Sequence, residues 1–125
     1  DNVFLMDDPE ASLTAAMLAS DLLISDASGV IFQYLILDRP IVLLSNPDKA
    51  QDASHFEADS PEWSWRDVAS DIRQISSLAN AVSEALINPN DKRDRRQFYA
   101  NLMFGNLTDG NAAQLIAQKI TGLGN

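Results

Sequence analysis

The sequence Leu22-Leu23-Ile24-Ser25-Asp26-Ala27-Ser28-Gly29-Val30 decides the fold, because it passes from an apolar strand through a polar turn into the start of a helix. The uninterrupted apolar run at its start is typical of a strand that helices cover on both faces. The small polar residues 25–29 suit a turn, and the apolar segment 30–37 suits a helix. This order predicts the strand-turn-helix unit of an α/β protein.

The segments on either side repeat this order. Downstream, Asp38-Arg39-Pro40 ends the predicted helix, and Ile41–Leu44 is a further predicted strand. Upstream, Val3–Met6 predicts a strand, and Asp7-Asp8-Pro9-Glu10 predicts a helix start because it offers an N-cap, an early proline and acidic residues. Strands that alternate with helices of about 10 to 15 residues indicate a parallel sheet, whose strand ends and following turns share one ligand-binding edge.

The remainder of the sequence predicts a long loop and then helices. Residues 46–67 are rich in turn formers and read as a surface loop. Helices are predicted from Ser76/Ser77 to Ile87, from about residue 91 to 104, and from Asp109-Gly110 to about residue 121. The expected fold is therefore α/β: a Rossmann-like three-layer fragment with a short parallel sheet flanked by helices and a helical C-terminal third.

Composition limits the classes of function. The 125 residues fit one domain, and the formal net charge of −9 argues against nucleic-acid binding, which depends on many Lys and Arg side chains. The chain has no cysteine, which excludes disulfides and thiolate metal sites. Its apolar runs are shorter than the ~20 residues that cross a bilayer. We expect a soluble domain that binds no nucleic acid and needs no metal or cofactor.

The turn after the first central strand is a candidate phosphate site. Ser25 and Ser28 offer hydroxyl donors, and Gly29 would let a ligand approach the backbone N–H groups at the helix start. No Lys or Arg occurs between Asp21 and Arg39, so these uncharged donors would carry the binding. A simpler interpretation stays open, in which Ser28 only caps the helix and Asp26 only forms the turn.

Two sequence blocks resemble the CDP-glycerol:poly(glycerophosphate) glycerophosphotransferases, and together they span nearly the whole chain. The first runs from Ala19 to Phe32 and continues into Leu37-Asp38-Arg39-Pro40-Ile41. The second is the basic and aromatic segment 92–99, followed by Asp109-Gly110-Asn111-Ala112-Ala113. The chain departs from the family pattern at Ala27, at Gly29 and at Gln33, so the identity of the donor is left open.

The resemblance implies that residues 1–125 are the C-terminal, donor-binding part of a two-domain (GT-B-type) transferase, without its acceptor domain. It implies a CDP-glycerol or related CDP-alcohol donor held near Ser28 and Gly29, and near the helix start at Asp109-Gly110. The family's proposed catalytic histidines would lie upstream, so we expect no catalytic residue here and no activity of the chain alone. A role in teichoic-acid-like polymer synthesis, at the cytoplasmic face of the membrane in the full-length protein, follows from the same resemblance.

Two other functions are consistent with parts of the sequence. A receiver-type signalling domain would use Asp7-Asp8, Asp26 and Ser45, but it also needs a lysine after a later strand, and no lysine is predicted there. A non-catalytic interaction domain is the third alternative.

Three further features have a plain and a functional interpretation. The basic cluster Lys92, Arg93, Arg95 and Arg96 would contact anionic lipid or polymer, or else pair with Asp91 and Asp94 on a solvated helix face. Trp63 and Trp65 would stack on a base or anchor the loop to the core. His55 lies in the loop and matches no catalytic motif.

Overall fold

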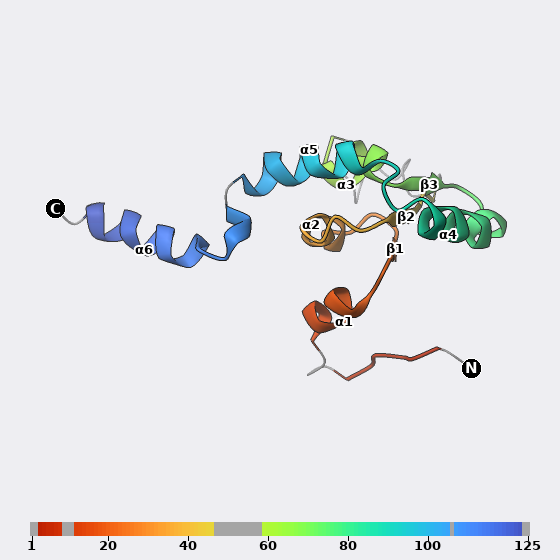
Figure 1. Cartoon of the computed structure of the whole chain (residues 1–125), viewed down its shortest axis with the longest axis horizontal. Helices are drawn as coiled ribbons and strands as arrows, with labels where there is room; N and C mark the ends of the chain where they lie inside the picture. The colour runs from red at the N-terminus through yellow and green to blue at the C-terminus, as the bar shows by residue number, and fades with distance from the viewer. Residues whose placement is uncertain (1–2, 9–11, 47–58, 106, 124–125) are drawn as a thin grey trace.

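The computed structural model describes residues 3–8, 12–46, 59–105 and 107–123 and centres on a parallel sheet (Figure 1). Its strands are β1 (Leu23–Ser25), β2 (Ile41–Leu44) and β3 (Ser70–Ile72), in the order β1-β2-β3. Both pairs of neighbouring strands are parallel. The carboxyl ends of the strands therefore meet at one edge of the sheet.

Helices lie on both sides of the sheet. On one face, α2 (Val30–Leu35) and α5 (Arg93–Phe104) form the main core with the sheet. On the other face, α4 (Leu78–Ile87) packs through Ala81 and Ala85 on Val42. The result is the predicted three-layer α/β arrangement, in which β2 is buried on both faces (Figure 1).

Alternation along β2 divides the two cores. Ile41 and Leu43 point to the α2 and α5 side, whereas Val42 points to the α4 side. Ile24 pairs with Val42 and shares its face, but its side chain is 45% exposed because α4 covers the sheet at β2 and β3. The expectation that helices cover both faces of the first central strand is therefore wrong at Ile24.

The N-terminal segment differs from the prediction. Val3–Met6 forms no strand, and Val3, Phe4 and Leu5 are largely exposed. An apolar run needs a neighbouring strand to satisfy its backbone, and no described strand pairs with this one. The first described helix, α1 (Leu13–Ala19), begins after Ser12, whose hydroxyl accepts the Ala15 N–H at 3.2 Å, so Ser12 and not Asp7-Asp8 caps it. The predicted helix start at Pro9-Glu10 lies outside the described residues.

The predicted loop 46–67 contains more structure than expected. Residues 47–58, including His55, lie outside the described residues. After them come α3 (Pro61–Ser64) and the 3₁₀ turn η2 (Arg66–Val68), which lead into β3. The sequence did not predict β3, because a strand of three residues that contains Ser70 and Asp71 has little strand propensity. The helix α2 has six residues, shorter than the predicted range.

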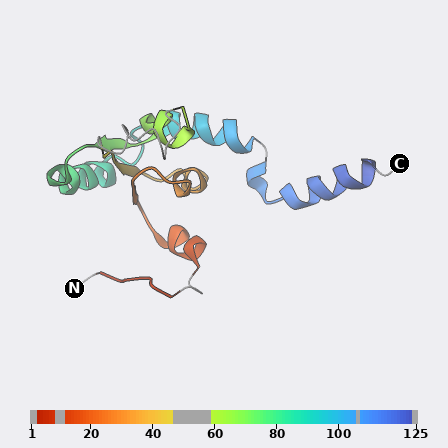
Figure 2. The ribbon, with the colours of Figure 1, turned by 180° about the vertical axis from the view of Figure 1, so that it is seen from behind.

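The helical C-terminal third agrees with the prediction. The 3₁₀ turn η3 (Ile75–Ser77) leads into α4, which ends at Asn88, and α5 follows. The chain then forms the turn η4 (Leu107–Asp109) and the helix α6 (Ala112–Leu123), which extends away from the sheet (Figures 1 and 2). No helix in the described ranges is long and apolar enough to span a membrane.

Candidate functional site

The predicted phosphate turn lies at the carboxyl end of β1 and leads into α2. Ser25 is the last residue of β1, Asp26 and Gly29 are exposed, and Ser28 is partly buried. Gly29 has φ −60° and ψ −17°, values that any residue adopts, so the backbone does not require glycine there. A Cβ at Gly29 would meet nothing within 4 Å. The space beside its backbone is therefore open to a ligand.

Backbone hydrogen bonding leaves part of this turn available. The Ser28 carbonyl accepts the Ile31 N–H at 3.1 Å, and the Ser28 hydroxyl accepts the Val30 N–H at a long 3.5 Å. Among the described residues, the N–H groups of Ser28 and Gly29 form no hydrogen bond. Because α2 has only six residues, its dipole adds little, and these N–H groups with the serine hydroxyls are the donors that an oxyanion would meet.

Strand register places a second set of polar groups beside this turn. Ser25, Leu43 and Asp71 are direct partners across the sheet and share its α2 and α5 face. Ser45 follows β2, and its hydroxyl donates to Asp71 Oδ1 at 2.6 Å. Polar groups from all three strands therefore gather toward the carboxyl edge.

Arg66 joins these groups to the predicted turn. Its Nε donates to Asp71 Oδ2 at 3.0 Å and its Nη2 to Asp71 Oδ1 at 3.1 Å. Its Nη1 donates to the Asp26 carbonyl oxygen at 3.4 Å and to that of Glu62 at 3.2 Å. The Arg66 side chain is only 12% exposed and lies over the ring of Trp63.

Arg66 was not among the predicted site residues. The turn has no cation of its own between Asp21 and Arg39, but the fold brings one from the segment before β3. No motif marks this arginine, and its partner Asp71 belongs to the strand that was not predicted. Only the parallel pairing of β2 with β3 makes the proximity evident.

The other predicted site residues, Asp109 and Gly110, lie at the start of α6. Asp109 ends η4 and bonds to Asn111, the residue before α6: its Oδ1 accepts the Asn111 N–H at 3.0 Å, and its Oδ2 accepts from Asn111 Nδ2 at 2.9 Å. These two bonds lower the pKa of Asp109 below its ordinary value of 3.8. No hydrogen bond or ion pair of the described residues joins them to the turn at 25–29, and η4 and α6 lie beyond the end of α5 (Figure 2).

The segment Asp38-Arg39-Pro40 does more than end a helix. Asp38 has φ +50°, and its carboxylate accepts bonds from Arg93 Nε at 2.7 Å, Arg96 Nε at 3.2 Å and Gln97 Nε2 at 3.1 Å. This group of four side chains, the Asp38 corner, fixes the end of α2 to the start of α5. Arg39 in turn donates to carbonyl oxygens around the end of α1, those of Met17, Leu18 and Ser20. This motif therefore connects helices.

The basic cluster is paired differently from the prediction. Arg96 is 1% exposed and adds bonds to the carbonyl oxygens of Asp91 and Pro89. Arg95 pairs with Asp67 at 2.5 Å. The predicted side-chain partners Asp91 and Asp94 are therefore wrong, because η2 and the segment after α2 supply the carboxylates instead.

Trp65 belongs to the core. Its ring stacks on Tyr99 at 4.5 Å and meets Phe32 edge-on at 5.7 Å, so its interpretation as a packing anchor is confirmed. The Tyr99 hydroxyl donates to Asp67 Oδ1 at 2.9 Å and accepts from Arg95 Nη2 at 2.8 Å. Burial and the bond to Asp67 raise the pKa of Tyr99 above its ordinary value of 10.0.

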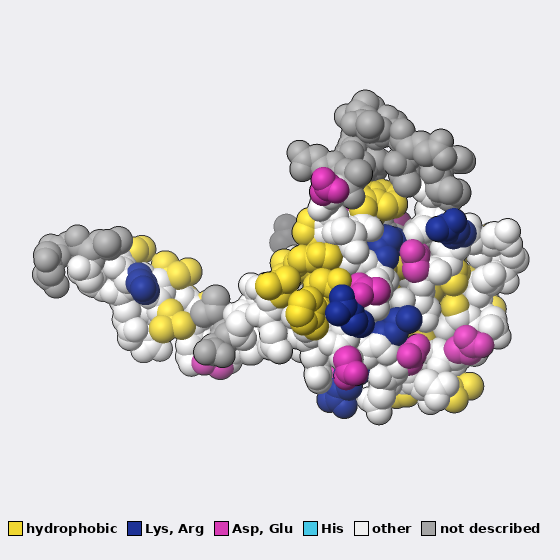
Figure 3. Space-filling model, turned by 90° about the horizontal axis from the view of Figure 1, so that it is seen from above, with side chains coloured by type: hydrophobic (Ala, Val, Ile, Leu, Met, Phe, Trp, Pro, Cys, Tyr) yellow, Lys and Arg dark blue, Asp and Glu magenta, His cyan; other side chains and the backbone are white. Residues whose placement is uncertain are grey.

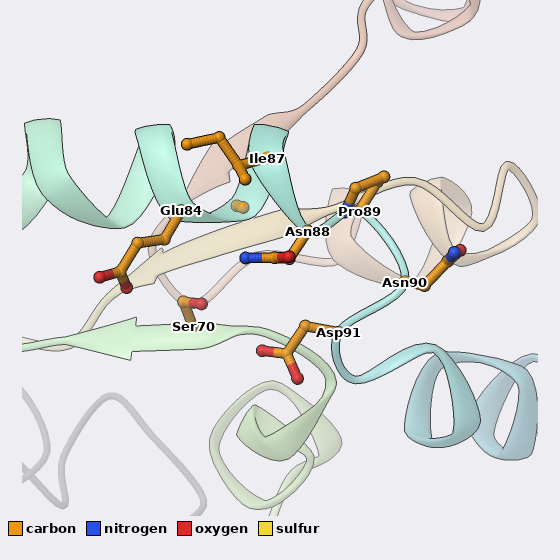
Figure 4. Close-up of a pocket in the computed structure, with 8 residues that line it drawn as sticks. Ser70, Glu84, Ile87, Asn88, Pro89, Asn90 and Asp91 are labelled. Atoms are coloured by element: carbon orange, nitrogen blue, oxygen red, sulfur yellow. The ribbon is translucent and has the colours of Figure 1, made fainter.

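A cavity of about 650 Å³ lies at the opposite end of the sheet from the predicted turn. Figure 4 shows it between the first residue of β3, Ser70, and the end of α4, with Glu84, Asn88 and Asp91 around it. Among the described residues, no group of three or more His, Cys, Asp or Glu side chains is placed to hold a metal ion. The acidic residues that a receiver-type domain would use to bind a metal ion therefore form no such group in the described part of the chain.

Comparison with known proteins gives the family. Searches of curated proteins and of solved structures returned no match. The profile of the CDP-Glycerol:Poly(glycerophosphate) glycerophosphotransferases, however, matches residues 1–122, which includes both sequence blocks, the turn at the end of β1 and the Asp38 corner. The chain therefore belongs to the CDP-glycerol:poly(glycerophosphate) glycerophosphotransferase family, a family of transferases.

Proposed function

We propose that this chain binds the CDP-alcohol donor of a glycerophosphotransferase at the turn formed by Ser25, Asp26, Ser28 and Gly29. The observation that carries the proposal is the family match over residues 1–122. The position of the turn supports it, because ligands of parallel sheets bind at the carboxyl ends of the strands. The open space at Gly29 supports it as well.

Each residue of the turn has a role in this proposal. The Ser25 and Ser28 hydroxyls and the N–H groups of Ser28 and Gly29 donate to the diphosphate oxygens. The exposed Asp26 carboxylate would repel a phosphate, so it accepts from a hydroxyl of the donor instead. These residues bind and orient the donor and take no part in proton transfer.

The start of α6 is a second proposed donor contact, through Asp109 and Gly110. Its position beyond α5 makes this contact separable from the first by experiment. The acceptor site and the residues that move protons belong, in this proposal, to a further domain of a longer GT-B-type protein at the inner face of the membrane. The chain alone would then bind donor weakly and transfer nothing.

Titration of the ¹⁵N-labelled chain with CDP-glycerol tests the donor site. Amide shifts concentrated at residues 25–30 are expected, and shifts at residues 109–112 would add the second contact. Shifts elsewhere with none at 25–30 would contradict the proposed site. Turnover of CDP-glycerol by the chain alone would contradict the assignment of catalysis to another domain.

Two glycine variants provide a matched control. Gly29→Val should fold normally, because its Cβ meets no neighbour, but should fill the space that the diphosphate needs and abolish the shifts at 25–30. Gly122→Val introduces the same side chain at another open position, in α6, and should leave donor binding unchanged. Equal effects of both variants would argue against a specific site at Gly29.

A further inference from the structure

We propose that Arg66 is a positioning residue for the donor turn: held by Asp71, it fixes the Asp26 carbonyl and thereby orients the N–H groups of Ser28 and Gly29. This inference rests on the proposed donor site. It assigns a role to a residue that lies 40 positions beyond the turn. The structural basis is the chain of hydrogen bonds from β2 and β3 to the turn.

Asp71 anchors the Arg66 guanidinium. Asp71 binds Arg66 through both carboxylate oxygens, at 3.0 and 3.1 Å, a bidentate geometry that fixes both position and plane. The Ser45 hydroxyl holds the same carboxylate at 2.6 Å. With the Glu62 carbonyl on Nη1, the arginine is restrained from three directions.

The Arg66 side chain also extends to the turn after β1. β1 and β3 are both neighbours of β2 and do not touch each other, so a direct backbone bond between them is impossible. Arg66 lies in η2, before β3, and its side chain contacts groups of both outer strands. The guanidinium thus connects the Asp26 carbonyl, which accepts from Nη1, with the Asp71 carboxylate, which accepts from Nε and Nη2.

The ion pair with Asp71 limits the charge that Arg66 presents to a donor. The Asp71 carboxylate neutralises much of the guanidinium charge, so Arg66 acts on the donor chiefly through the turn. A lysine at this position could pair with Asp71, but its single ammonium lacks the planar fork that reaches both Asp71 oxygens and the Asp26 carbonyl. Arg66→Lys should therefore preserve the fold and retain only part of the positioning.

The test compares Arg66→Ala and Arg66→Lys with the control Arg73→Ala, which removes an exposed arginine after β3. In the free chain, Arg66→Ala should lower the ¹⁵N backbone order parameters of residues 26–29 from about 0.85 to below about 0.6. Unchanged amide signals of α2, β2 and α5 would show that the fold persists. Arg73→Ala should leave the turn as it is.

Donor titration supplies the second readout. Arg66→Ala should raise the Kd for CDP-glycerol roughly tenfold, as expected for the indirect loss of one charge-assisted bond, and Arg66→Lys by less. Unchanged order parameters in Arg66→Ala would overturn the positioning role, whatever the donor does. A more mobile turn with an unaltered Kd would also overturn it. Absence of donor shifts in the unmodified chain would instead contradict the donor site itself, which separates the two failures.

Discussion

Two arginine–carboxylate groups lie on the same side of the sheet, and their surroundings differ. In the Asp38 corner, the Arg96 side chain is 2% exposed. Its bonds join α5 to Asp38, after α2, and to the loop that precedes α5. In the group of Arg66, Asp71 and Ser45, the side chains of the ion pair are 12% and 31% exposed, and one bond leads to a turn. Both groups pair an arginine with a carboxylate, but the arginine of the Asp38 corner is more deeply buried.

We expect this difference in burial to separate residues that stabilise the fold from residues that position the turn. Removing one partner of a buried ion pair leaves a charge without solvation, whereas water can partly replace the lost partner of a partly exposed carboxylate such as Asp71 at a lower cost. The Asp38 corner should therefore control the free energy of unfolding, and the Arg66 group should control the conformation of the turn.

The largest effect is expected for Arg96→Ala. Loss of a guanidinium that bonds Asp38 and two carbonyl oxygens should lower the free energy of unfolding by about 3 kcal/mol or more, measured by urea denaturation. Arg93→Ala removes the other, 50% exposed arginine of the same corner and should cost no more than about 1 kcal/mol. Equal losses would show that burial does not separate the two arginines.

Substitutions of Asp38 separate its charge from its backbone conformation. Both Asp38→Ala and Asp38→Gly remove the carboxylate, but alanine also keeps the strain of φ +50°, which glycine relieves. We expect Asp38→Gly to be about 1 kcal/mol more stable than Asp38→Ala in the same denaturation experiment. If both variants lost the same amount, the left-handed conformation would carry no strain.

Tyr99 gives a smaller, pH-dependent effect. Tyr99→Phe should cost about 1 kcal/mol near neutral pH, because it removes the hydroxyl between Asp67 and Arg95. Since the folded pKa of Tyr99 is raised, its contribution is fully present below pH 10 and is lost as the pH rises through the folded value. The unmodified chain should therefore lose more stability than Tyr99→Phe above pH 10. Parallel alkaline curves would contradict this assignment.

The smallest effect is expected at Asp109, which is exposed. Because its folded pKa is lowered, the contribution of its bonds to Asn111 is present above the ordinary pKa and disappears as the pH falls through the lowered value. The Asn111 amide signal should therefore titrate in acid below pH 3.8, the ordinary pKa, and this titration should vanish in Asp109→Asn. A midpoint at or above that ordinary value would contradict the lowered pKa.

The sequence predicted the elements that have strong local patterns. The apolar run of β2, the polar turn at 25–29 and the stop at Asn88 were all correct, because turn chemistry and strand propensity decide them locally. What the sequence could not predict depends on distant partners. β3 is too short to show an alternating apolar pattern. The apolar run at Val3–Met6 has no neighbouring strand among the described residues.

The same division holds for the site. Local composition predicts Ser25, Ser28 and Gly29 as candidate residues, whereas Arg66 is evident only when β3 lies beside β2. The predicted partners of Arg95 and Arg96 were wrong for the same reason. The prediction used carboxylates that are near in sequence, whereas the folded chain pairs these arginines with Asp67 and Asp38. Ion pairs between elements follow topology, which single-sequence patterns do not specify.

The helix α6 has a consequence for cooperativity. It packs on η4, its neighbour in the chain, and the exposed apolar side chains of Leu115, Ile116 and Ile120 lie on an arm apart from the main body (Figure 3). A helix of 12 residues is marginal in water without tertiary packing. Its hydrogen bonds should therefore open and close independently of the sheet, as a separate folding unit. Amide exchange in α6 would then report local fraying, while exchange in β2 would report unfolding of the whole sheet.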